Sequence, residues 1–400
     1  MRRIRHRFDG TIWTRNLVLF AVAVLVARFG QGLLGGARMN FFVETLGLSG
    51  GQVLWLEGIR ELPGLGLILI AALTMRLPLP RQGALALLLM GVGYALYAFV
   101  RSYSALLAAA IVASLGFHMW TPLHSAMGMS FSKRENTGRV LGTLASVSSL
   151  AAIAGMGAIS LVSRLLESMP LNIYYLVGGT FIVLSALLIV RLPKGIGSTG
   201  AKPPRILLGR RYWLYHVLMF FAGARKLVLS SFVTLVLVQD FDLKVWQVST
   251  LMLVSSILNL LSAPLLGSLV DRFGERITTP VAYLVLALCC LGYATIDSLW
   301  LLIALWVLMR LVMPLGMGLS TYVYRTAPPE ELTPTLSAGV TFDHISSVSM
   351  PFLAGVLLPA IQYEGIFMGT AVLILLSIPF ACALQVRAPS ALQALPSSAE

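Results

Sequence analysis

Residues 267–276 read GSLVDRFGER, a short charged turn between two long apolar runs. Nearly all of the other charge-dense stretches lie at a terminus or in a longer linker. A helix needs about 20 mostly apolar residues to cross the hydrocarbon core of a bilayer. A charged turn this short therefore predicts two membrane helices that are joined tightly on one side of a membrane.

The composition excludes a soluble protein. Of the 400 residues, 58% are hydrophobic and 11% are charged, whereas soluble domains carry about 25% charged residues. The net charge of +13 does not indicate a nucleic-acid partner, because most basic residues lie in alternate junctions between apolar runs. The three cysteines lie in apolar runs without metal-ligand spacing, so neither a metal site nor a disulfide is predicted. The expected partners are a lipid bilayer and a small-molecule solute.

The chain contains twelve apolar segments of spanning length, which predicts an all-α polytopic membrane protein. The segments are 16–37, 52–75, 83–100, 103–127, 138–162, 171–190, 213–238, 246–269, 278–296, 299–323, 334–359 and 365–385. The stretch 191–212 between the sixth and seventh is basic and rich in Gly and Pro, so it reads as a linker. We expect two six-helix bundles, 16–190 and 213–385, with a short N-terminus at 1–15 and a disordered tail at 386–400.

Positive charges predict the orientation. Three of the junctions on one side hold only Arg101, Arg164 and Lys244, whereas the termini and the other junctions hold most of the Lys and Arg. By the positive-inside rule, both termini and the 267–276 turn are expected on the cytoplasmic side of the inner or plasma membrane. The two halves also repeat, since Leu48 to Val53 reads LSGGQV and Leu243 to Val248 reads LKVWQV.

Together, the twelve segments, the basic linker and the spacing G-x-x-x-D-R-x-G-x-R resemble the major facilitator superfamily of transporters. The resemblance covers about residues 10–388 and implies two six-helix bundles that rock about a central cavity. The first half departs from the pattern, because Arg76 stands where the repeat would place the counterpart of Asp271. The fifth segment has Ala151 and Gly155 but lacks the Gly-Pro motif of drug/proton antiporters, which disfavours drug efflux.

Polar and basic residues within the segments are candidates for binding a solute, because an ionisable group at mid-membrane needs a partner or a water-filled cavity. A guanidinium there would bind a carboxylate or phosphate bidentately. The alternative is that these groups pair with internal acids or pack as satisfied polar residues. Arg225 and Lys226 are about 100° apart on a helix and cannot both point the same way. The candidates are Arg28, Gln31, His118, Arg225, Lys226, Asn259 and Arg310.

Acidic residues and one histidine are candidates for proton coupling. Glu57 and Glu61 share one face of the second segment with Arg60, so they form either an internal ion-pair cluster or a coupling site. Asp343, followed by His344, is the acid deep in the second half. Asp343 would either pair with Arg310 or Lys226, or carry protons, because a desolvated carboxylate can titrate near neutral pH.

The 267–276 turn is the predicted gating loop. By family analogy, Asp271 would lie near the N-terminal end of the eleventh helix, where the helix dipole favours a negative charge. This would latch the cytoplasmic side shut; the alternative is a plain tight turn with surface ion pairs. The loop residues concerned are Gly267, Asp271, Arg272, Gly274 and Arg276.

The sequence thus favours a secondary active transporter with alternating access. The basic cavity residues favour an organic anion, coupled to protons, carried by a monomer. An efflux antiporter for amphipathic drugs is the alternative within this class, and a non-transporting sensor or scaffold is the alternative outside it. No H-E-x-x-H, P-loop or G-x-S-x-G motif indicates an enzyme. Residues 30–35 fit G-x-G-x-x-G without a preceding strand, so they predict close helix packing rather than a nucleotide cofactor.

Overall fold

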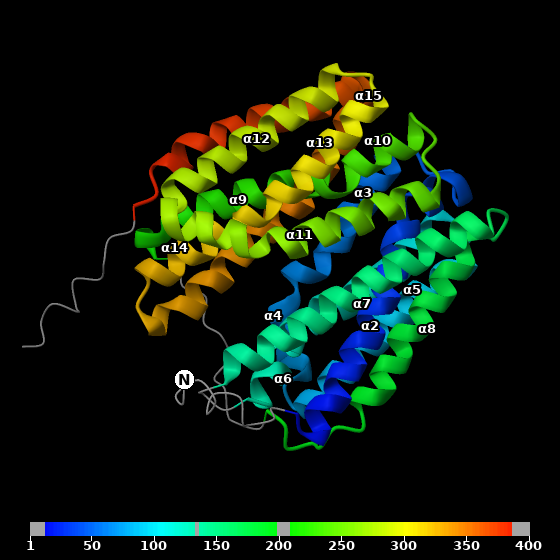
Figure 1. The fold of residues 1–400 in the computed structure, drawn as a ribbon, viewed down its shortest axis with the longest axis vertical. Coiled ribbons are helices and arrows are strands. Elements are labelled where there is room, and N and C mark those ends of the chain that lie inside the picture. The colour runs from blue at the N-terminus through cyan, green and yellow to red at the C-terminus, as the bar shows by residue number, and fades with distance from the viewer. Residues whose placement is uncertain (1–12, 133–135, 198–208, 386–400) are drawn as a thin grey trace, which may run out of the picture. The chain divides into compact units, whose positions relative to one another are not determined.

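The computed structural model describes residues 13–132, 136–197 and 209–385, and this part of the chain is helical with no strand (Figure 1). Residues 1–12 of the expected N-terminus, 198–208 of the expected linker and the expected tail 386–400 lie outside the described residues. The all-α membrane fold expected from the sequence is confirmed.

The helical elements follow the predicted segments in order. From the N-terminus they are α2 (Arg15–Asn40), η1 (Phe41–Thr45), α3 (Gly50–Leu65), α4 (Leu67–Thr74), α5 (Leu79–Leu96), η2 (Tyr97–Phe99), α6 (Tyr103–Ser130), α7 (Thr137–Leu165) and α8 (Leu171–Ile189). After residue 208 come η3 (Arg210–Tyr212), α9 (Trp213–Leu227), η4 (Val228–Phe232), α10 (Val233–Gln239), α11 (Val245–Phe273), α12 (Glu275–Thr295), α13 (Leu299–Val312), η5 (Met313–Met317), α14 (Gly318–Thr326) and α15 (Pro329–Cys382).

Ten helical spans in the described residues are long and apolar enough to cross a membrane, and two local features reconcile them with the twelve expected segments. The segment 52–75 is divided into α3 and α4 at Gly66, three residues after Pro63, which lacks a backbone donor. The segments 334–359 and 365–385 both fall in α15, which breaks at Gln362, where φ is 55°.

The chain forms two compact units. Unit 1 comprises the described parts of Met1–Ser49, Ile59–Gly200 and Val238–Ile257; unit 2 comprises those of Gly50–Gly58, Ala201–Leu237 and Leu258–Glu400. In unit 1, α2 packs against α7 and α8, and α5 packs against α6 and α8. In unit 2, α15 packs against α9 and α12.

Glycines allow the helices of unit 1 to approach closely, as expected for Gly30 and Gly32, whereas a Cβ on Gly35 would meet no atom within 4 Å. A Cβ on Gly32 would collide with the carbonyl oxygen of Ala152 on α7, and one on Gly155 would collide with that of Phe29 on α2. Gly30 is similarly close to Gly178 on α8. Small residues of this kind are typical of helix contacts within membranes, where packing replaces the hydrophobic effect.

Candidate functional site

Arg28 lies at the middle of α2 with its charge held by a neutral partner. Its Nη1 donates to Gln31 Oε1 at 2.6 Å, one helical turn away, and Gln31 Nε2 in turn lies 3.3 Å from Met90 Sδ on α5. The Nε of Arg28 is buried and has no hydrogen-bond partner in the described chain. Arg28 and Gln31 therefore form a hydrogen-bonded pair, and part of the guanidinium is available to a further acceptor.

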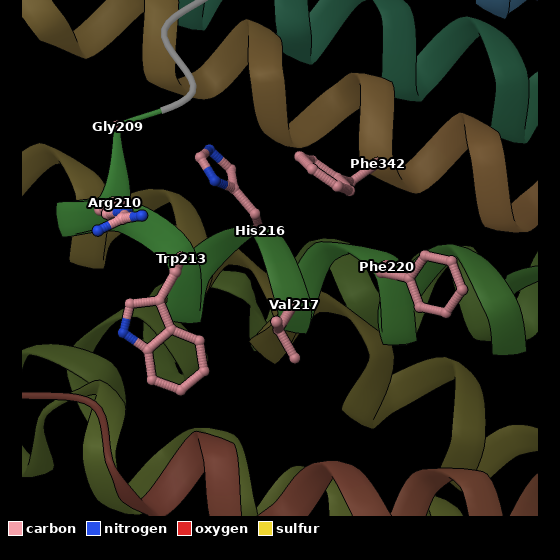
Figure 2. Close-up of a pocket in the computed structure, with 7 residues that line it drawn as sticks. All are labelled: Gly209, Arg210, Trp213, His216, Val217, Phe220 and Phe342. Carbon is pink, nitrogen blue, oxygen red and sulfur yellow. The ribbon is translucent and has the colours of Figure 1, made fainter.

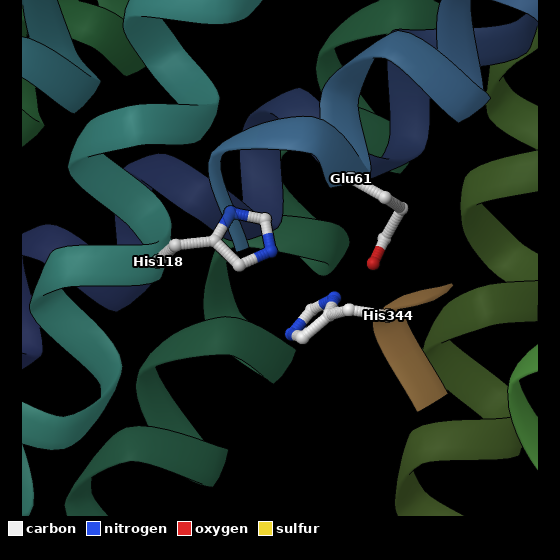
Figure 3. Close-up of side chains that lie close together, drawn as sticks. All are labelled: Glu61, His118 and His344. Atoms are coloured by element: carbon white, nitrogen blue, oxygen red, sulfur yellow. The ribbon is translucent and has the colours of Figure 1, made fainter. Parts of the chain in front are cut away.

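His118 on α6 is fixed by its neighbours in unit 1. Its Nδ1 lies 2.9 Å from the carbonyl oxygen of Ser114, which can only accept, so Nδ1 carries the proton and Nε2 is an acceptor in the neutral ring. The hydroxyl of Ser114 donates to the carbonyl oxygen of Arg60 on α3. A ring nitrogen of His118 and a carboxylate oxygen of Glu61 lie within 4.8 Å, and Figure 3 shows the two side chains pointing toward one another.

The acidic residues expected to share one face of the second segment belong to different units. Glu57 is buried in unit 2, whereas Arg60 and Glu61 belong to unit 1. Arg60 Nη2 lies 3.5 Å from the hydroxyl of Tyr94 on α5. Arg60 thus contacts α5, and Glu61 lies near His118 of α6.

Arg225 and Lys226 on α9 point in different directions, as the helical geometry predicts. Arg225 is 6% exposed; its guanidinium carbon lies 3.8 Å from the centroid of the Tyr283 ring on α12, and its Nη1 is 3.5 Å from Ser377 Oγ on α15. Lys226 Nζ instead lies 3.5 Å from Asp343 Oδ2 on α15, with both side chains partly exposed. The buried guanidinium is held by an aromatic ring, and the accessible ammonium is held by the carboxylate.

The guanidinium of Arg310 on α13 contacts η4, the π-helical turn that follows α9. Its Nη2 donates to the carbonyl oxygen of Ser230 at 2.8 Å, within the π-helical turn η4, and its guanidinium carbon lies 4.8 Å from the Trp306 ring centroid. Trp306 is fixed by a hydrogen bond from Nε1 to Thr234 Oγ1 at 3.1 Å. Short π-helical turns within α-helices are frequent at functional sites. Arg310 thus contacts a backbone carbonyl and an aromatic ring, and Lys226 forms the ion pair with Asp343 at 3.5 Å.

The remaining candidates in unit 2 are Asn259 and His344, and their surroundings are less specific. Asn259 on α11 is half-buried, and its Oδ1 has no hydrogen-bond partner among the described side chains and backbone. His344 is buried on α15 and directly follows Asp343, so the two side chains point in different directions from one helix. Neither residue gives a specific chemical role by its geometry.

The 267–276 turn joins α11 to α12, and Asp271 pairs with a residue that the sequence analysis did not single out. Arg325, in the last turn of α14, donates from Nη2 to Asp271 Oδ1 at 2.7 Å and lies 3.4 Å from Glu275. Glu275 is 1% exposed and accepts from Thr321 Oγ1 at 2.7 Å. The carboxylates of Asp271 and Glu275 thus share one guanidinium, which ties α11 and α12 to α14.

The other residues of the turn have separate roles. Gly274 adopts φ 73°, a left-handed conformation that favours glycine, and it allows α12 to begin at Glu275. Arg276 Nε donates to the carbonyl oxygen of Cys382 at the end of α15, and Arg272 lies over the neighbouring Phe273 ring. A Cβ on Gly267 would meet open space. Gly274 therefore has a conformational role that Gly267 lacks.

Comparisons with known proteins are consistent with this architecture. The family profile described as Major Facilitator Superfamily matches residues 20–299 and 214–400. A comparison with curated proteins finds no matching sequence. Among solved structures, the nucleoside transporter NupG is similar in fold, with a TM-score of 0.75, 12% identity, and coverage of 93% of this chain and 99% of that chain.

Two further structures share the fold. A bacterial homologue of the human lysosomal transporter Spinster has a TM-score of 0.72 at 14% identity, over 94% of this chain and 97% of that one. The human organic anion transporter MFSD10 has a TM-score of 0.54 at 17% identity, over 92% of this chain and 100% of that one. These identities support a shared fold and leave the solute open.

Proposed function

Because the chain belongs to the major facilitator superfamily, we propose that it is a secondary active transporter that carries a small organic anion, coupled to protons, by alternating access. Family membership points to a transporter rather than an enzyme. The two moving bodies would be the bundles 16–190 and 213–385 of a monomer. The distribution of Lys and Arg supports a plasma or inner membrane location with both termini in the cytoplasm.

The observation that carries the choice of an anion is the environment of Arg28. It donates to the neutral amide of Gln31, and no acidic side chain in the described chain forms an ion pair with it. An unneutralised charge in a membrane span is costly unless a ligand or water compensates it. A carboxylate or phosphate would supply that compensation and would accept from the free Nε.

The pair Lys226–Asp343 supports proton coupling. At 3.5 Å the carboxylate holds the ammonium, and both groups are partly exposed. Protonation of Asp343 would remove its charge and release Lys226, which could then hold the anionic solute. Loss of the proton would restore the ion pair and displace the solute. Asp343 would thus bind the proton, and Lys226 would pair in turn with this carboxylate and with the solute.

The experiment that tests the function is uptake into proteoliposomes that contain the purified protein. A panel of radiolabelled organic anions, cations and neutral amphiphiles would be offered to the vesicles. Uptake would be compared between vesicles whose interior is more acidic than, more alkaline than, or at the same pH as the external solution. We expect saturable uptake of at least one anion that responds to the pH difference. Preferential movement of cationic amphiphiles would favour drug efflux, and specific binding without movement of any solute would favour a sensor.

A further inference from the structure

A groove of about 430 Å³ follows one face of the first turns of α9 in unit 2 (Figure 2). Its lining side chains recur at intervals of three and four residues, so they share one side of the helix. They are Arg210, Trp213, His216, Val217 and Phe220, with Phe342 contributed by α15. The walls are therefore apolar along most of the groove, with one basic residue at its end.

His216 brings an unpartnered polar atom into this apolar groove. The residue is 6% exposed, and its ring stacks on Phe342 with centroids 5.1 Å apart and an interplanar angle of 22°. Figure 2 shows the ring on the side of α9 that faces Phe342. Its Nε2 is buried without a hydrogen-bond partner in the part of the chain that the structure describes. Leaving such a group unmatched costs free energy, which a ligand oxygen in the groove would recover.

Arg210 and Trp213 mark the depth of the groove relative to a membrane. Arg210 begins the apolar span Arg210–Gln239 and is exposed. The Trp213 indole is 54% exposed and packs edge-on against Phe380 of α15. Tryptophan and arginine together are typical of the boundary between the hydrocarbon core and the headgroups. We therefore expect the groove to begin near the level of lipid phosphates and to continue into the apolar layer.

We propose that this groove is a binding site for an anionic phospholipid. One acyl chain lies along Trp213, Val217 and Phe220, the phosphate is held by Arg210, and a phosphate or ester oxygen accepts from His216. The charge of Arg210 complements an anionic headgroup, and the volume falls in the range of about 300–1,000 Å³ that ligand pockets occupy. The proposal goes beyond transport, because none of these residues belongs to the set proposed to handle the solute or its protons.

The test uses the full-length protein purified in detergent and titrated with short-chain phosphatidylglycerol, with thermal unfolding as the readout. Phosphatidylcholine of the same chain length and inorganic phosphate are titrated in parallel. The variants are Arg210→Gln, which removes the cation, and Val217→Trp, which fills the groove. The matched control is Arg211→Gln, since Arg211 carries the same charge but donates to the carbonyl oxygen of Thr326 outside the groove.

We expect saturable stabilisation by phosphatidylglycerol that is weakened about fivefold by Arg210→Gln, lost in Val217→Trp and unchanged in Arg211→Gln. A photoreactive phosphatidylglycerol should crosslink to the peptide that contains Trp213 and Phe220, which tests the site without any variant. Equal binding of phosphatidylcholine, equal binding of free phosphate, or crosslinks elsewhere would each overturn the proposal. Stabilisation by soluble amphipathic anions without stabilisation by phosphatidylglycerol would also overturn it.

Discussion

Lys226 Nζ lies 3.5 Å from Asp343 Oδ2, and this ion pair links α9 to α15 within unit 2. Its neighbour in sequence, Arg225, is turned onto the ring of Tyr283 on α12. Two adjacent basic residues therefore have different partners and different exposure. Lys226 is accessible and can exchange its partner, whereas Arg225 is enclosed by the helices.

Replacing Asp343 by Asn should uncouple transport from protons. The amide cannot take up a proton, so Lys226 is no longer held and released as the pH changes. We expect Asp343→Asn to move the solute only down its own gradient, with initial rates that no longer respond to a pH difference in proteoliposomes. Asp297→Asn, at an exposed acid between α12 and α13, is the control and should retain the response. Full pH dependence in Asp343→Asn would exclude Asp343 as the coupling group.

Tyr283 is expected to stabilise unit 2 because its ring compensates the buried charge of Arg225. A desolvated cation over an aromatic ring contributes about 2 kcal/mol, and Tyr283→Phe keeps the ring whereas Tyr283→Leu removes it. Thermal unfolding should therefore show a marked loss of stability for Tyr283→Leu and little change for Tyr283→Phe. Arg225→Met, which replaces a buried charge by an apolar chain, should leave solute affinity within about twofold and stability nearly unchanged. If Arg225→Met folds but no longer binds the solute, the guanidinium contacts the solute directly.

Close packing beside Asp343 should make Gly223 intolerant of a side chain. A Cβ on Gly223 would collide with the carbonyl oxygen of Asp343 and with Ser346 Oγ, which forces α9 away from α15. We expect Gly223→Ala to destabilise the protein by about 1–3 kcal/mol, the usual cost of overpacking, and to slow transport. Gly369→Ala on α15 is matched to it, because a Cβ there meets no atom within 4 Å. The packing argument fails if both variants unfold at the temperature of the parent protein.

The partnership of Asp271 with Arg325 predicts that transport depends on the pair and folding does not. Asp271 is 76% exposed, and exposed ion pairs contribute about 0–1 kcal/mol, so Asp271→Asn should unfold near the parent temperature. Its transport rate should fall, because α14 is no longer held to α11 at this turn. Equal rates in the parent protein and Asp271→Asn would show that the turn is only a connection.

Much of the fold could be predicted from the sequence because membrane spans are long apolar runs with a clear length requirement. Local relations within one helix were also predictable, such as the bond between Arg28 and Gln31 and the divergence of Arg225 from Lys226. The two helix breaks illustrate the limit. The boundary expected between 359 and 365 coincides with the break of α15 at Gln362, whereas the segment 52–75, expected as one helix, is divided into α3 and α4 at Gly66.

The partners of the charged residues could not be predicted, because they depend on which helices pack together. Glu275 stands inside the quoted turn, yet its burial follows from the packing of α12 on α14. Thr321 lies at the end of the expected segment 299–323 and Arg325 just beyond it, and no sequence pattern connects either residue with Glu275. The same dependence on packing places Arg225 on Tyr283, so that its position in the seventh segment alone does not define its role.

The most direct test of the central claim is uptake of an organic anion by proteoliposomes containing Arg28→Gln beside the parent protein. The parent should show saturable uptake that responds to a pH difference. Arg28→Gln should raise the half-saturating anion concentration by about 10–100-fold, which corresponds to the 1.5–3 kcal/mol of a hydrogen bond to a charged group. Arg101→Gln, at an exposed arginine between α5 and α6, should behave as the parent. Unchanged half-saturation in Arg28→Gln would contradict the account, because Arg28 would then not hold the anion.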